Sequence, residues 1–172
     1  VKALADVVTP QRLVKTEDEV KCIRKAIAIQ QEALEWALAE ASQLLSKPAK
    51  SGPKPKPFTE QDFAALLEYR MRTQGSPKTS FETIVGSGPN AALPHYRAGA
   101  GKIKPGTPVL IDWGATYRGY HGDMTRVVNF NAKWPAKWLE IFKICEEAHH
   151  TGAAALAPGK TGAEVDAAAR DV

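Results

Sequence analysis

Cysteine is scarce in this chain of 172 residues, and long apolar runs are absent. The only two cysteines, Cys22 and Cys145, lie far apart and outside any Cys-x-x-Cys spacing. A disulfide between them is the alternative, but we expect two free, half-buried thiols and a cytoplasmic location. No apolar run approaches the roughly 18 residues of a membrane-spanning helix, and the N-terminus lacks the apolar core of a signal peptide.

Several common catalytic motifs are also absent. The sequence has no Gly-x-Ser-x-Gly, no P-loop and no Gly-x-Gly-x-x-Gly, so serine acyl transfer, phosphate and dinucleotide chemistry have no basis. The net charge is only +4, and four lysines gather in one Pro-rich stretch without interleaved aromatics. We therefore expect neither nucleic acid nor a membrane as a partner. The composition, 44% hydrophobic and 24% charged, is typical of a globular domain with its own core.

Apolar periodicity and helix-capping signals predict the order of the elements. They indicate helices over 16–46 and 59–74 separated by a Lys/Pro-rich loop (47–57), then a strand and hairpin region (81–130) and helices over 135–157 and 161–172. We predict one domain over residues 1–172. The chain has no initiator Met, and its last helix begins with a capping box but stops after a few turns, so we expect the domain to be truncated.

The residues with the clearest chemical potential are two aspartates, Asp112 and Asp123, each set among apolar neighbours. A hairpin centred between Tyr117 and Arg118 would place them directly opposite one another, with Cβ atoms about 4.5–5.5 Å apart. Two carboxylates so placed repel unless one is protonated or a cation lies between them. The pair is therefore a candidate site for a hard divalent metal ion. The alternative is that both are ordinary hydrogen-bonded residues near a turn.

The four histidines give weaker signals. His95 follows a Gly-Pro-Asn turn and, taken alone, is typical of a surface loop. His121 lies two residues before Asp123, so in a regular strand it would share the face of that carboxylate and support the site. His149 and His150 follow two glutamates on a predicted helix, where a solvated polar face is favoured over a zinc site.

Three segments carry a resemblance to a known family. They are residues 87–96 (Ser-Gly-Pro-Asn-Ala-Ala-Leu-Pro-His-Tyr), 111–115 (Ile-Asp-Trp-Gly-Ala) and 120–126 (Tyr-His-Gly-Asp-Met-Thr-Arg). Together they resemble the pita-bread metallopeptidases, and within them the prolidase and aminopeptidase P branch. The resemblance covers nearly the whole chain. It implies an α+β fold, the N-terminal half of a pita-bread (creatinase/aminopeptidase) fold, with an antiparallel sheet and helices packed on one face.

The resemblance also implies roles for single residues. Asp112 would bind one metal ion and Asp123 would bridge two. His95 matches a histidine that contacts substrate and assists proton transfer without binding metal. Thr125 would support the metal ligands, and His121 is the weaker candidate for the same task. The methionine aminopeptidases and creatinases fit these segments less well.

The implied activity is that of an Xaa-Pro aminopeptidase or dipeptidase, a dinuclear metallopeptidase that cleaves between an N-terminal residue and a following proline. Two divalent ions are expected, manganese first, with cobalt or zinc as alternatives. The family's remaining ligands, one His and two Glu, are not in this sequence, so we expect the chain alone to be inactive. Its partners would be a proline-containing peptide, the missing C-terminal half of the catalytic domain and, in a homodimer, a second copy. The alternative is a non-catalytic pita-bread module that binds protein or nucleic acid.

Overall fold

A computed structural model describes residues 6–46 and 56–172 of the chain. Most of the predicted Lys/Pro-rich loop at 47–57 lies outside the described residues. The chain divides into two compact units, Val1–Ala132 and Lys133–Val172, where the sequence predicts one domain. A bilayer-spanning helix is not found among the described residues.

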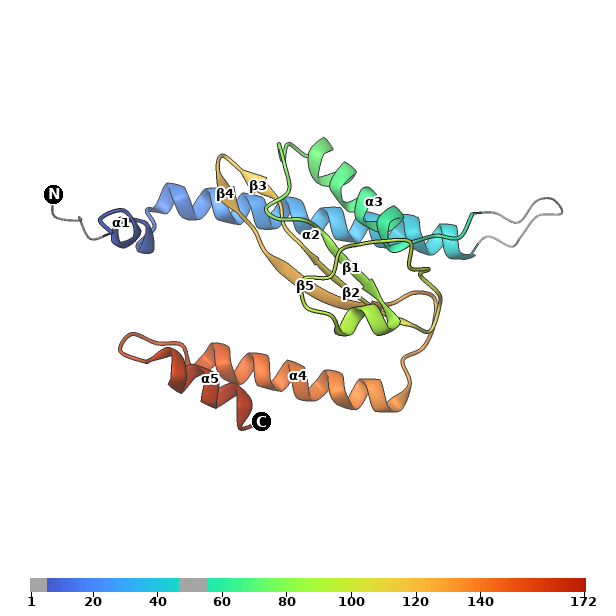
Figure 1. The fold of residues 1–172 in the computed structure, drawn as a ribbon. Coiled ribbons are helices and arrows are strands. Elements are labelled where there is room, and N and C mark those ends of the chain that lie inside the picture. Colours follow the sequence, from blue (N-terminus) through green and yellow to red (C-terminus); the bar gives the residue numbers. More distant parts are fainter. Residues whose placement is uncertain (1–5, 47–55) are drawn as a thin grey trace, which may run out of the picture. The chain divides into compact units, whose positions relative to one another are not determined.

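The first unit begins with three helices (Figure 1), α1 (Thr9–Leu13), α2 (Glu17–Ser46) and α3 (Glu60–Thr73). A capping box begins α2, because the Thr16 amide donates to Glu19 Oε2 at 2.6 Å and the Glu19 amide donates to Thr16 Oγ1 at 3.3 Å. Thr59 and Asp62 form a second capping box at the start of α3. This helix ends before Gly75, whose φ of 96° lies in the left-handed region that favours glycine. The caps account for both helices starting where the sequence predicts.

The sheet of the first unit is antiparallel, with strand order β1-β2-β5. Its strands are β1 (Ile84–Ser87), β2 (Pro108–Trp113) and β5 (Met124–Asn129), and a separate two-stranded ladder joins β3 (Thr116–Tyr117) to β4 (Tyr120–His121). A short 3-10 helix, η1 (Gly88–Ala92), follows β1. Figure 1 shows α2 passing along one face of this sheet, with α3 beside it.

The core lies between α2, α3 and one face of the sheet. Every second residue of β2, namely Val109, Ile111 and Trp113, is fully buried there. Four alanines of α2, at positions 26, 33, 37 and 41, are also fully buried, and their small side chains let the helix approach the sheet closely. The Trp113 indole donates to the backbone carbonyl of Gln30 at 3.0 Å. Strand alternation therefore places Asp112 on the opposite face, away from α2 and α3.

The second unit is a helical hairpin of α4 (Ala136–Ala155) and α5 (Gly162–Arg170). The predicted capping box is present at the start of α5, formed by Thr161 and Glu164. Gly152 is buried at the contact, where an added Cβ would lie 3.2 Å from the Cβ of Ala169. Both cysteines are free thiols, but Cys145 on α4 is exposed rather than half-buried as predicted.

Candidate metal centre

The pairing of β2 with β5 corrects the predicted hairpin register. Asp112 lies opposite Thr125, not opposite Asp123, so the predicted direct pairing is wrong by two residues. The turn closes at Arg118 and Gly119, which both have positive φ, 48° and 84°. Two such residues form the tight turn that favours glycine, and Gly119 occupies its second position. A shift by two residues preserves the face to which each side chain points.

The two aspartates still meet in one cleft of the first unit. The cleft has a volume of about 370 Å³. Its lining comes from the segment before and within β1, from the loop after η1, and from the two aspartates, namely Phe81, Glu82, Ile84, His95, Tyr96, Arg97, Asp112 and Asp123. The structure therefore brings together the two predicted metal ligands and the predicted catalytic histidine, which are separated by up to 28 positions in the sequence.

Electrostatics make Asp112 the distinctive member of this group. Burial raises the pKa of the Asp112 carboxyl, and the neighbouring carboxylate of Asp123 raises it further. A hydrogen bond from Thr125 and the charge of His95 act in the opposite direction on the same pKa. Asp112 Oδ1 is buried without a hydrogen-bond partner. A buried carboxylate oxygen with no donor, beside a second carboxylate, has the chemistry of a ligand for a hard cation.

The donor set within the described residues is nevertheless small. No group of three or more His, Cys, Asp and Glu side chains in residues 6–46 and 56–172 is arranged to hold a metal ion. Asp112 and Asp123 fit such an ion by chemistry and position, but they supply only carboxylate oxygens from two residues. Tight binding of two ions needs more ligands than this pair supplies.

The two residues predicted to support the metal ligands, Thr125 and His121, lie in different surroundings. Thr125 lies directly across from Asp112, and its side chain lowers the pKa of that carboxyl, as expected of a residue that orients the carboxylate. His121 does not line the cleft. It pairs with Thr116 in the β3–β4 ladder, where its Nδ1 lies 3.2 Å from Thr116 Oγ1. The alternation argument fails because β4 ends at His121, so no regular strand connects His121 to Asp123.

Two glycines leave no room for a side chain next to Asp123. A Cβ at Gly114 would overlap the carbonyl oxygen of Gly122, and a Cβ at Gly122 would overlap the side-chain oxygen of Gln30. Gln30 itself is fully buried, and its Oε1 accepts from the Ala115 amide at 3.2 Å. This close approach fixes the backbone immediately before Asp123. Sequence reasoning did not predict the contact, because Gln30 lies on a helix 92 positions before Gly122.

Glu60 is a second residue that the sequence did not reveal as part of the site. It is fully buried, and its carboxylate binds the loop that carries His95. In the sequence it is one acidic residue in the first turn of a helix, which is ordinary for that position. The one signal in the sequence that could have drawn attention to Glu60 lies in a distant segment. Gly99 and Gly101 lie against Glu60 in the structure, and two glycines so close together indicate a place where the backbone approaches another group.

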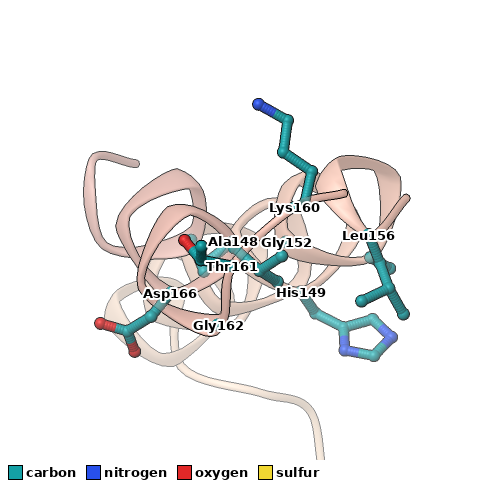
Figure 2. A pocket seen from close by; sticks show the side chains of 11 residues that line it. Ala148, His149, Gly152, Leu156, Lys160, Thr161, Gly162 and Asp166 are labelled. Atoms are coloured by element: carbon teal, nitrogen blue, oxygen red, sulfur yellow. The ribbon is translucent and has the colours of Figure 1, made fainter. Parts of the chain in front are cut away.

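A larger hollow, of about 550 Å³, lies in the second unit between α4 and α5. Its lining is mostly small and apolar, and Figure 2 shows the polar side chains of His149, Lys160 and Asp166 pointing apart. A binding site for a small molecule normally combines an apolar pocket with a few convergent polar groups. The predicted polar face of α4 also gives no metal site, although the rings of His149 and His150 lie 5.5 Å apart. The cleft at Asp112 is therefore the better candidate site.

Comparison with known proteins defines the class to which this fold and site belong. Residues 21–172 match metallopeptidase family M24, and the chain is a member of that family.

Individual relatives resemble the chain over nearly its whole length. The chain is 34% identical to an Xaa-Pro dipeptidase of Pyrococcus furiosus over 171 residues, which cover 99% of this chain and 45% of that protein. It superposes on an X-Pro aminopeptidase from Thermotoga maritima with a TM-score of 0.85 and 34% identity, over 98% of this chain and 44% of the other. The prolidase of Pyrococcus furiosus gives a TM-score of 0.82 at 34% identity, over 96% and 45%.

These comparisons confirm the predicted family and fold class. The chain is α+β, with a helix-covered antiparallel sheet, and has the fold of the N-terminal half of the pita-bread prolidases. It spans less than half the length of each of the relatives just described. Membership of a metallopeptidase family implies divalent metal ions.

Proposed function

We propose that the complete protein is a metal-dependent exopeptidase that cleaves the bond between an N-terminal residue and a following proline, as an Xaa-Pro aminopeptidase or dipeptidase. The observation that carries the proposal is the cleft that unites Asp112, Asp123 and His95. Within it, Asp112 Oδ1 is buried and has no hydrogen-bond donor. Relatives described as Xaa-Pro dipeptidase and X-Pro aminopeptidase support the substrate class.

Four residues in or beside the cleft have proposed tasks. Asp112 would hold one divalent ion and Asp123 would be shared between two, with manganese as the expected metal and cobalt or zinc as alternatives. When bound, such ions lower the pKa of water and polarise the scissile carbonyl. Thr125, which lies directly across from Asp112 in the ladder, orients the Asp112 carboxylate. His95, on the loop facing the aspartates, contacts the substrate and moves a proton. His121, which lies outside the cleft, receives no task.

For these 172 residues alone we propose no peptidase turnover. Two carboxylates are too few to hold two metal ions tightly, and no group of three or more potential ligand side chains is found in the described part of the chain. The other ligands, and the rest of the substrate cleft, would come from a C-terminal half of the catalytic domain. A cytoplasmic location and assembly as a homodimer belong to the same proposal, and the free thiols of Cys22 and Cys145 support the former.

The test is an assay of the complete protein on a matched pair of dipeptides, Ala-Pro and Ala-Ala, with and without a chelator. We expect metal-dependent cleavage of Ala-Pro and its loss in the Asp112→Asn variant. A Glu68→Gln variant, altered on α3 away from the cleft, serves as the matched control and keeps full activity. Equal cleavage of both dipeptides would refute the proline preference. Absence of cleavage at every metal concentration would favour the non-catalytic binding module.

A further inference from the structure

A buried carboxylate organises the loop on one side of the cleft. Glu60, the first residue of α3, is 0% exposed. Its Oε1 accepts from the Ser87 amide at 2.7 Å and from the Asn90 side-chain amide at 2.9 Å. Its Oε2 accepts from the Tyr96 hydroxyl at 2.9 Å and from the Gly99 amide at 3.3 Å. A fully buried carboxylate is rare unless it is paired or hydrogen-bonded, and here four donors surround one side chain.

All four donors belong to a single segment, residues 87–99, and His95 lies within it. The start of α3 also binds the end of this segment through its backbone. The Glu60 amide donates to the Gly101 carbonyl at 2.9 Å, and the Gln61 amide donates to the Gly99 carbonyl at 3.1 Å. A Cβ at Gly101 would lie 2.5 Å from the Glu60 carboxylate. The segment is therefore tied to Glu60 before, within and after the part that carries His95.

His95 needs such support because its backbone is in a costly conformation. Its φ is 55°, in the left-handed region, which is uncommon for residues other than glycine. Strained backbone persists only where the surrounding structure determines it strongly. No hydrogen bond reaches the His95 imidazole from the described part of the chain, so the backbone, which fixes the direction of the Cα–Cβ bond, decides toward which side the ring projects. The next residue, Tyr96, lines the same cleft and donates its hydroxyl to Glu60.

We propose that Glu60 is a positioning residue for this site. By binding Asn90 and Tyr96 on either side of His95, it holds the imidazole at the cleft that contains Asp112 and Asp123. Glu60 does not line that cleft, and both of its carboxylate oxygens accept from donors of the loop. The effect of Glu60 on catalysis rests on the proposed function. The effect of Glu60 on the His95 loop does not, because the chain without metal or substrate already has these contacts.

The experiment compares Glu60→Gln with the wild-type chain. Glutamine has nearly the same shape but replaces one acceptor oxygen with an NH2 group, which faces either the Tyr96 and Gly99 donors or the Ser87 and Asn90 donors. We expect amide exchange at Gly99 or Ser87 to rise about tenfold, as for loss of one charge-assisted hydrogen bond. We also expect the NMR signals of the His95 imidazole to shift and broaden.

Two further variants separate positioning from general loss of stability. Leu67→Ala removes a fully buried side chain from the same helix and lowers the melting temperature without touching the loop, so the His95 signals should stay unchanged. Tyr96→Phe removes one donor and should give a smaller change of the same kind as Glu60→Gln. Unchanged His95 signals in Glu60→Gln, or an equal change in Leu67→Ala, would overturn the proposal.

The consequence for catalysis is measured separately in the complete protein. Glu60→Gln should lower kcat about tenfold or more while KM changes by less than about twofold, because the loop positions a group for the reaction rather than for binding alone. A kcat equal to that of wild type would overturn the positioning role. If the wild-type protein cleaves no Xaa-Pro peptide, the proposed function fails, and the His95 signals alone decide the role of Glu60.

Discussion

The substitution Gly122→Ala tests how the backbone before Asp123 is held. The new methyl group would overlap Gln30 Oε1, the atom that accepts from the Ala115 amide. Gln30 is fully buried and its backbone carbonyl is bound to Trp113, so only its side-chain amide can yield. Moving that amide leaves the buried Ala115 donor unpaired, which costs about 1–3 kcal/mol. We therefore expect the first unit to lose about 1–3 kcal/mol of stability.

Amide hydrogen exchange in β2 is the suitable assay, because it reports the stability of the first unit without assuming that both units unfold together. Gly99→Ala is a matched control, since its Cβ would make only ordinary contacts, 3.5 Å from the Tyr96 hydroxyl, and should change stability by less than about 0.5 kcal/mol. In a Gln30→Ala background the obstacle is gone, so Gly122→Ala should then cost little. An equal cost of Gly122→Ala in both backgrounds would refute this explanation of the contact.

The remaining predictions concern the hairpin and its carboxylates. Because folding raises the pKa of Asp112 above its ordinary 3.8, its ionisation opposes folding as pH rises through that range. The metal-free Asp112→Asn variant should therefore have a higher melting temperature than the wild type at pH 7 but not at pH 3. Calorimetry in the presence of a chelator measures both melting temperatures. A difference in melting temperature that is the same at both pH values would contradict the prediction. Arg118→Asn relieves a positive φ in a turn that favours Asn-Gly. The substitution should raise the free energy of unfolding, measured in urea, by about 0.5 kcal/mol. A decrease in the free energy of unfolding would argue against the assigned turn.

Much of the fold follows from local signals in the sequence. Capping boxes at Thr16 and Thr161 identify the starts of two helices, because side chain and backbone satisfy one another over only four residues. The alternation along β2 identifies its buried face for a similarly local reason. The family resemblance, which depends on short segments, correctly indicates the pita-bread fold.

The details of the site depend on contacts that local signals do not contain. The predicted register missed by two residues, because the conformations of Arg118 and Gly119 decide the centre of the hairpin. The shared face of the two aspartates survived, since an even shift preserves it. Glu60 and Gln30 escaped prediction for another reason. Their partners lie at least 27 positions away, and nothing in a single helix sequence shows that a polar residue will be buried.

The central claim is that Asp112 and Asp123 belong to a two-metal peptidase site. The most direct test is the metal content of the complete protein, purified with Mn²⁺ and measured by elemental analysis after extensive dialysis. We predict about two equivalents per chain, in keeping with a two-metal hydrolase, and a clear loss in both Asp112→Asn and Asp123→Asn, with the Glu68→Gln control unchanged. Absence of bound metal in the wild type, or full occupancy in both aspartate variants, would contradict the claim.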